Sequence, residues 1–229
     1  MKILVVDNNV MPDSYGSDDL VKYGKLIPGS TVFVRRGPHH DLPAHPTEFD
    51  RIILSGSLTG AEEDAPWVDA LMSFIRETVD RGVPLFGVCY GHQMIARALG
   101  GKQVVGKNRV PEFGWTEVEI IEQSPLFEGL ENRFHSFSYH YDCVKELPAG
   151  FRLLARSEDC EIQAYTIQDK PVFGIQFHPE KPLGEEDEAY LDLKKKGLER
   201  YFRHPKQGKK LYRQSVGDTL FSNFFKLRP

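Results

Sequence analysis

Residues 83–101 hold the pattern that most limits how this chain can fold. Val83–Val88 is a short, largely apolar run, which is typical of a strand buried on both faces of a sheet. His92–Leu99 follows with the spacing of a helix and ends at two glycines. The turn between them is Gly-x-Cys-x-Gly, whose glycines allow a sharp bend and the close passage of neighbouring chain. A buried strand that turns directly into a helix predicts an α/β fold.

The rest of the pattern predicts one domain, residues 1–229, built on a doubly wound, mostly parallel sheet in three layers. Pro66–Arg81 has apolar residues at helical spacing, and a last helix is expected over Val216–Leu227. The first half supplies three more strands, at Ile3–Val6, Thr31–Arg35 and Ile52–Leu54. The second half is richer in strands, which predicts antiparallel additions at Gln103–Val105, Thr116–Ile121, Phe151–Ala155, Ile162–Ile167 and Val172–Phe177.

Cys89 occupies the turn between the strand and the helix, where a thiol can serve as a nucleophile. The N-terminus of a helix carries partial positive charge, which favours the thiolate. The alternative is a small buried core residue, which is the usual role of a free cysteine. The turn alone leaves these two interpretations about equally favoured.

A second strand ends in chemistry that complements a thiol. Val172–Phe177 runs into His178-Pro179-Glu180. A thiol nucleophile needs a base to take its proton, and the base needs a third group that fixes its ring and tautomer. His178 can be that base, Glu180 can bond its other ring nitrogen, and Pro179 stiffens the spacing. Each residue alone is usually structural, but together with Cys89 they predict a Cys-His-Glu triad.

Three motifs in this order and at this spacing resemble the class I glutamine amidotransferases: Leu54–Ser57, Gly87–Gln93 and Phe177–Glu180. The resemblance is strongest to the free-standing, GMP-synthase-like members, through three further segments: Asp64–Trp67, Ala96–Gly101 and Glu112–Trp115. It implies a flavodoxin-like α/β fold with a mixed sheet flanked by helices. It also implies hydrolysis of the γ-carboxamide of glutamine through a thioester on Cys89.

The resemblance further implies which groups surround the thiol. The backbone N–H groups of Gly56, Ser57 and Tyr90 would stabilise the oxyanion. Here the sequence departs from the family pattern, because Ser57-Leu58 stands where Gly-Pro is usual. If that position required a positive φ, Ser57 would be strained.

Substrate contacts are implied for Gln93, Tyr139 and His140. Gln93 lies one helical turn after Cys89, although a glutamine on the helix surface is an alternative interpretation. Tyr139 and His140 fall in the place of the family's Ser-His-x-Asp segment, with Tyr139 in place of a small residue. The contacts predicted there are therefore less direct than those of the triad.

A strongly charged segment, residues 183–214, separates the His-Pro-Glu motif from the last helix. Lys194–Arg213 contains nine Lys or Arg and one Glu, and it follows the acidic run Glu185–Glu188. Such a run is commonly a solvated helical face, and less commonly a docking surface. Because members of the family usually reach the last helix sooner, we expect an insertion that shapes substrate access or partner contact.

Composition and cysteine use limit the function classes. Three widely spaced cysteines argue against a disulfide framework and favour a reducing, cytoplasmic compartment. No apolar run approaches the roughly 20 residues that span a bilayer, and a net charge of −4 gives no general affinity for nucleic acid. His39–Asp41 with His45 has metal-binding side chains, but in a proline-interrupted loop they favour solvation, so we expect no metal and no cofactor.

Three functions are left open by the sequence. The first is an amidotransferase subunit that passes ammonia from glutamine to a synthase partner, since the sequence has no ATP-pyrophosphatase loop and no Walker A motif. The second is a free-standing γ-glutamyl peptide hydrolase, because the same thioester chemistry cuts any γ-glutamyl amide. The third is a non-catalytic binding module, which an intact set of Cys89, His178 and Glu180 makes the least favoured.

Overall fold

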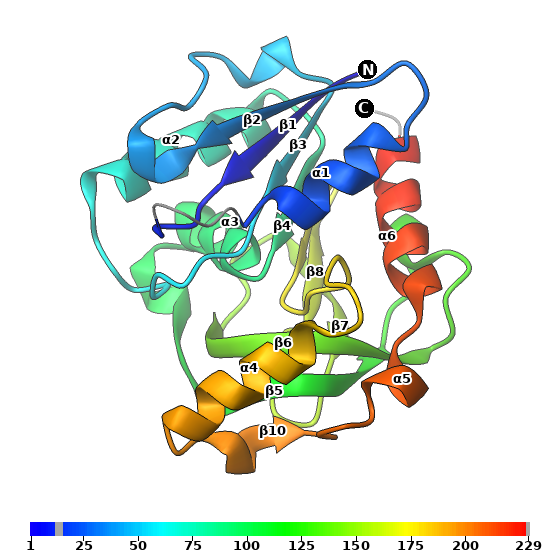
Figure 1. The fold of residues 1–229 in the computed structure, drawn as a ribbon. Helices are drawn as coiled ribbons and strands as arrows, with labels where there is room; N and C mark the ends of the chain where they lie inside the picture. Colours follow the sequence, from blue (N-terminus) through cyan, green and yellow to red (C-terminus); the bar gives the residue numbers. More distant parts are fainter. Residues whose placement is uncertain (12–15, 228–229) are drawn as a thin grey trace.

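The computed structural model describes residues 1–11 and 16–227, and its core is a single sheet with helices on both faces (Figure 1). The strands run in the order β10-β5-β7-β8-β9-β4-β3-β1-β2, and β6 pairs with β5 outside this path. The strands are β1 Lys2–Asp7, β2 Thr31–Arg36, β3 Arg51–Leu54, β4 Leu85–Val88, β5 Val105–Ile120, β6 Arg133–Val144, β7 Phe151–Arg156, β8 Ala164–Ile167, β9 Val172–Ile175 and β10 Phe202–Arg203. The helices are α1 Asp18–Lys25, α2 Pro66–Asp80, α3 Tyr90–Gly100, α4 Glu185–Lys195, α5 Gly208–Leu211 and α6 Gln214–Lys226. Five 3-10 turns complete the described elements: η1 Gly37–His39, η2 Pro46–Glu48, η3 Lys102–Val104, η4 Pro125–Phe127 and η5 Glu199–Tyr201.

The sheet is mixed, with a parallel half and an antiparallel half. β2, β1, β3, β4 and β9 are all parallel to their neighbours in that order. β8, β7, β5 and β6 are joined by antiparallel pairing, and β9 meets β8 antiparallel as well. This arrangement confirms the predicted α/β class with a mostly parallel sheet and antiparallel additions in the second half of the chain.

Side chains of β1 alternate between two cores, which makes the fold three-layered. Ile3 and Val5 pack in one core with side chains of α1 and α6. Leu4 and Val6 pack in the other core with side chains of α2 and α3. Figure 1 shows the two helix pairs on opposite sides of the strands. Every residue of β3, β4 and β9 is buried, as expected of strands covered on both faces.

The charged segment, residues 183–214, packs against the antiparallel half of the sheet. It contains α4, η5, β10 and α5, and β10 pairs with β5 through Phe202 and Arg203. Leu193 of α4 and Phe202 are buried in a third apolar cluster with Phe113 and Trp115 of β5. The segment is thus anchored by apolar side chains, and its charges lie around that anchor. Figure 1 shows α4 lying across β5 and β6.

One expectation about local structure was wrong, and one strand was not predicted. Gln103–Val105 was expected as a strand, but η3 occupies Lys102–Val104 and β5 begins only at Val105. Gly101 adopts φ 90° at the end of α3, and the tight turn that follows uses up these residues. The long strand β6 was not predicted, because polar side chains such as Ser136 and Ser138 fill its buried face and hide the apolar alternation.

Across the described residues, no helix is both long enough and apolar enough to pass through a lipid bilayer.

The packing of α3 against β3 gives a first prediction. A Cβ added to Gly91 would lie 2.5 Å from the carbonyl oxygen of Leu54, and backbone cannot yield as a side chain would. We expect Gly91→Ala to lower the free energy of unfolding by about 3 kcal/mol, measured by chemical denaturation. The matched control is Gly82→Ala, whose site is open but has φ 69°, so that only a left-handed backbone cost of about 1 kcal/mol applies. Equal losses for the two variants would contradict the close approach.

Candidate active site

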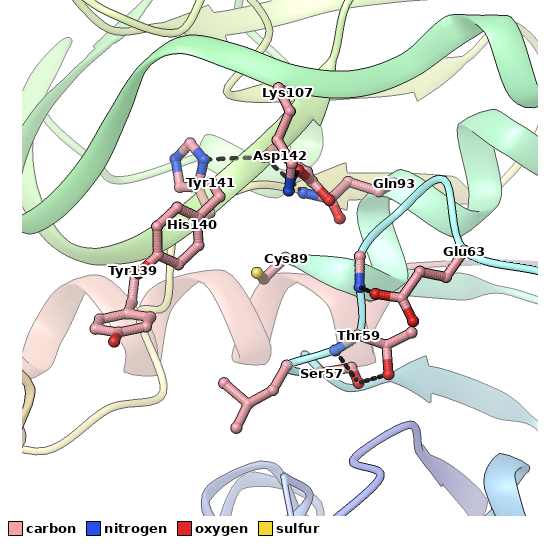
Figure 2. A pocket seen from close by; sticks show the side chains of 12 residues that line it. Ser57, Thr59, Glu63, Cys89, Gln93, Lys107, Tyr139, His140, Tyr141 and Asp142 are labelled. Atoms are coloured by element: carbon pink, nitrogen blue, oxygen red, sulfur yellow. Dashed lines mark hydrogen bonds and ion pairs between the residues drawn. The ribbon is translucent and has the colours of Figure 1, made fainter. Parts of the chain in front are cut away.

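Cys89 lies between the end of β4 and the start of α3, in a strained backbone conformation. Its φ is 51° and its ψ is −105°, a region that non-glycine residues rarely adopt. The backbone N–H of Cys89 donates to the carbonyl oxygen of Ile175 in β9 at 2.8 Å, and the Cys89 carbonyl accepts from Gln93 at 3.0 Å. These bonds hold the thiol at the edge of the sheet, where Figure 2 shows its sulfur facing a cavity.

The flanking glycines serve close packing, and the sharp turn is made by Cys89 itself. Neither Gly87 nor Gly91 has a positive φ. A Cβ on Gly87 would lie 2.6 Å from backbone atoms of Gly91, and a Cβ on Gly91 would meet Leu54 in β3. The prediction of close passage is therefore confirmed, whereas the positive φ that the turn requires falls on Cys89.

His178 and Glu180 extend from the end of β9 toward Cys89. The ring Nδ1 of His178 lies 2.6 Å from Oε1 of Glu180, and both side chains are largely buried. The backbone N–H of His178 donates to the carbonyl of Phe137 in β6 at 2.7 Å. The side chain of Cys89 is near enough to the His178 ring to raise its pKa. The three predicted triad residues are thus brought together in one connected chain of side chains.

The charges around His178 decide its protonation state. Burial lowers the pKa of this imidazole, but the negative charges of Glu180 and Cys89 outweigh burial and raise the pKa to about 10. At neutral pH the ring is therefore an imidazolium that can donate a proton. Because the pKa in the fold exceeds the unfolded value, the pair stabilises the protein fully below the unfolded pKa, and this contribution is lost as pH rises through about 10.

The Ser55–Ser57 turn after β3 approaches the triad from another side. The Ser55 hydroxyl accepts a hydrogen bond from the Asn8 N–H at 2.9 Å, which fixes the turn to β1. A Cβ on Gly56 would lie 3.0 Å from Cε1 of His178, so a glycine allows the ring to sit against the backbone. Ser57 does not adopt a positive φ, and the strain considered for it does not arise.

A compact cavity of about 160 Å³ opens beside Cys89, and we call it the inner cavity (Figure 2). Its lining residues are Ser57, Leu58, Thr59, Gly60, Glu63, Cys89, Gln93, Lys107, Tyr139, His140, Tyr141 and Asp142. The Asp142 carboxylate accepts from the Ala61 N–H at 2.7 Å and forms an ion pair with Lys107 at 2.6 Å. The sequence motifs pointed to Asp142, but neither Lys107 nor Glu63 carried a signal that would have placed it here.

Gln93 and His140, both predicted to contact a substrate, are buried side chains in the lining of the inner cavity. The Gln93 amide donates to the Asp142 carbonyl at 2.8 Å and to Gln176 Oε1 at 3.0 Å, so the helix-surface interpretation was wrong. The two ring nitrogens of His140 lie 3.0 Å from the Asp142 carbonyl oxygen and 2.9 Å from Glu112 Oε2. His140 therefore supports the Asp142 backbone from behind, and its ring nitrogens are already bonded within the protein.

Tyr139 connects the site to α4. Its hydroxyl donates to Oδ2 of Asp192 at 2.7 Å. Burial, followed by the hydrogen bond and charge of Asp192, raises the pKa of Tyr139, so the phenol stays protonated. The family's small residue could not make this contact, which explains the departure that the sequence showed at this position.

A second, larger cavity of about 650 Å³ meets the inner cavity at Cys89, and we call it the outer cavity. The two cavities share Ser57, Leu58, Cys89, Tyr139 and Tyr141. The remaining lining residues of the outer cavity are Asn9, Gly16, Gly56, Phe137, His178, Glu180, Lys181, Glu185, Glu188, Ala189, Asp192 and Lys196. His178 thus lines the outer cavity, whereas the ion pair of Asp142 and Lys107 lines the inner one.

Among the described residues, one buried group could offer ligand atoms to a metal ion, and it includes His140 of the inner cavity. Atoms of Glu112, His140 and Cys160 lie within 4.8 Å of one another. Glu112 already accepts hydrogen bonds from Ser157 and Gln163, each at 2.6 Å, in addition to its contact with His140. The arrangement is therefore a hydrogen-bonded cluster.

The electrostatics of His178 give a second prediction. In Glu180→Gln the carboxylate charge is removed, so the pKa of His178 should fall by about 1–3 pH units. Titration of the His178 ring signals by NMR measures this directly, with a midpoint near pH 10 expected for the unmodified chain. The pKa of His135 is lowered chiefly by burial, and Glu180 is not among the groups that act on it, so His135 should titrate identically in both proteins. A His178 midpoint near its ordinary value in the unmodified chain would contradict the coupled triad.

Comparison with known proteins assigns a family to this geometry. The sequence pattern of the glutamine amidotransferase class-I family matches residues 29–196. A glutamine-hydrolyzing GMP synthase subunit from Methanocaldococcus jannaschii is 33% identical over 156 residues, which cover 68% of this chain and 74% of that protein. The protein of the same name from Thermococcus kodakarensis is 46% identical over 98 residues, 43% of this chain and 51% of that protein. The matched stretch thus spans about half the length of that relative.

A solved structure of a glutamine amidotransferase from Thermotoga maritima has the same fold, with a TM-score of 0.77 at 24% identity over 99% of each chain. The family pattern covers most of the sequence, and the fold covers nearly all of it. This chain therefore belongs to the class I glutamine amidotransferase family.

Proposed function

We propose that this chain hydrolyses the γ-carboxamide of glutamine through a thioester on Cys89, releasing glutamate and ammonia. The observation that carries the proposal is the junction of the strained Cys89 with the buried His178–Glu180 pair, beside a cavity with charges of both signs. The family to which the chain belongs supports the same reaction.

The proposed reaction has two steps that balance in protons. The Cys89 sulfur attacks the γ-carbonyl carbon, and the C–N bond breaks as the His178 imidazolium gives its proton to the leaving nitrogen. Water then attacks the thioester carbonyl, and His178 takes a proton from it as general base. The C–S bond then breaks, glutamate leaves, and the Cys89 thiolate and the His178 imidazolium are regenerated, while Glu180 holds the ring in one orientation throughout.

The oxyanion of each tetrahedral intermediate needs backbone donors. The N–H of Tyr90 is the first of α3, and the first amides of a helix have no carbonyl of a preceding turn to bond. The amides of Gly56, which lies against His178, and of Ser57 after it are the proposed second source of donors. A donor of this kind typically stabilises the transition state by about 3–4 kcal/mol.

The inner cavity is the proposed site for the amino-acid head of the substrate. Asp142 and Glu63 offer carboxylates for the α-ammonium group, and Lys107 offers a cation for the α-carboxylate. Gln93 commits its amide hydrogens to the protein, which leaves its oxygen for the substrate. In this proposal His140 positions Asp142 and does not touch the substrate through its ring, while Tyr139 forms part of the wall.

Two functions are proposed, and they differ in the amine that the reaction releases. Relatives named as part of a GMP synthase support delivery of ammonia to a separate synthase partner. The alternative is a free-standing γ-glutamyl peptide hydrolase, and the size of the outer cavity on the His178 side favours it. Both share the thioester on Cys89.

The proposed chemistry gives a third prediction. Glutamate release from glutamine by the purified chain should fall at least about 10³-fold in Cys89→Ala, because the nucleophile of a triad cannot be replaced by its neighbours. The matched control is Cys143→Ala, which removes another buried, free thiol that lies outside both cavities. Glutamate release that survives in Cys89→Ala would rule out the thioester.

A further inference from the structure

We propose that the outer cavity binds the leaving amine of the substrate, and that the preferred substrates are γ-glutamyl amides of an alkyl diamine. Glu188 of α4 would pair with the far ammonium group of that amine. This inference rests on the proposed function, since it uses the same Cys89 thioester and the same proton from His178, and it names the substrate class of that site.

The position of His178 tells which cavity receives the leaving group. The leaving nitrogen must take its proton from this ring, so it lies on the side that the ring faces. His178 and Glu180 line the outer cavity and are absent from the inner one. With the amino-acid head of the substrate in the inner cavity, the scissile bond sits at Cys89 and the amine extends outward.

The size of the outer cavity exceeds what ammonia needs. Ammonia is about as large as water, which occupies roughly 30 Å³ in the liquid. The outer cavity measures about 650 Å³. An amine with a chain of several carbons fits this space, and Leu58, Phe137 and Tyr141 supply apolar surface for its methylene groups.

The places where the sequence departs from the family pattern all meet in this cavity. Ser57-Leu58 and Tyr139 line it, and so does α4 from the charged segment, residues 183–214. The wall is firmly built, because Tyr139 bonds Asp192 of α4 and Leu193 is buried in the third apolar cluster. If these departures from the family pattern had no common cause, we would expect them at separate places in the structure. A change in the leaving group that the site accepts would instead alter the side chains around one cavity.

The charges of this wall favour a cation over a carboxylate on the amine. Lys181 already pairs with Asp19 at 3.1 Å and with Glu185 at 3.8 Å, and Lys196 pairs with Asp192 at 2.7 Å. Within the described part of the chain, Glu188 has neither a hydrogen bond nor an ion pair. The acidic side chains Glu185, Glu188 and Asp192 outnumber Lys181 and Lys196 in this lining, so a second ammonium group is favoured there over the carboxylate of a leaving amino acid.

The test compares the kcat/KM of four substrates: glutamine, the γ-glutamyl butylamide, the γ-glutamyl 4-aminobutylamide and γ-glutamylglycine. We expect the 4-aminobutylamide to be cleaved at least about tenfold more efficiently than glutamine, with the butylamide between them and γ-glutamylglycine poorest. Glu188→Gln should reduce the advantage of the aminobutylamide over the butylamide by about fivefold. The matched control is Asp187→Asn, which changes an exposed acid on the same helix outside the cavity. It should leave the ratio of kcat/KM between the aminobutylamide and the butylamide unchanged.

The outcomes separate this inference from the proposed function. Cys89-dependent cleavage with glutamine as the best substrate would overturn the inference and leave the proposed function intact, and it would favour a synthase partner at the outer cavity. A preference for γ-glutamylglycine would overturn the charge argument in favour of a peptide hydrolase. An aminobutylamide preference that Glu188→Gln does not reduce would overturn the role of Glu188. Cleavage of none of the four amides would refute the proposed function itself.

Discussion

The close contact between α3 and β3 is the constraint on which the site depends. Gly91 lies so near the Leu54 carbonyl that the helix is pressed against the sheet, and the chain leaving β4 must turn within one residue. That residue is Cys89, which takes a positive φ and so projects its thiol from the edge of the sheet. The strained backbone of Cys89 is thus maintained by backbone packing on both sides of it, and it needs no contribution from the cysteine side chain.

Adjacent parallel strands then supply the partners of the thiol. β4 and β9 are neighbours, so their carboxyl ends lie side by side, and the residues that follow β9 reach Cys89 directly. His178 is buried between two acidic groups, and their charges raise its pKa against the effect of burial. Two cavities meet at Cys89: the inner one is lined by the ion pair of Asp142 and Lys107, and the outer one by His178 and α4.

The parts of this arrangement that follow from neighbouring strands could be predicted from the sequence. Motifs at the ends of two apolar runs predicted the meeting of Cys89 with His178, because parallel strands align such ends. The roles of His140 and Glu112 could not be predicted in this way, because their pairing depends on the register of β5 against β6. Likewise, the charge pattern of residues 183–214 gave no sign that the apolar Leu193 and Phe202 would fix α4 as a cavity wall.

The proposed reaction passes through a covalent γ-glutamyl group on Cys89, which mass spectrometry of the protein can detect. The chain would be quenched in acid during turnover of a γ-glutamyl amide, digested and examined peptide by peptide. We expect the mass of the peptide that contains Cys89 to increase by one glutamyl group, and the masses of the peptides that contain Cys143 and Cys160 to stay the same. Turnover with an unmodified Cys89 peptide throughout the steady state, or a label on another residue, would contradict it.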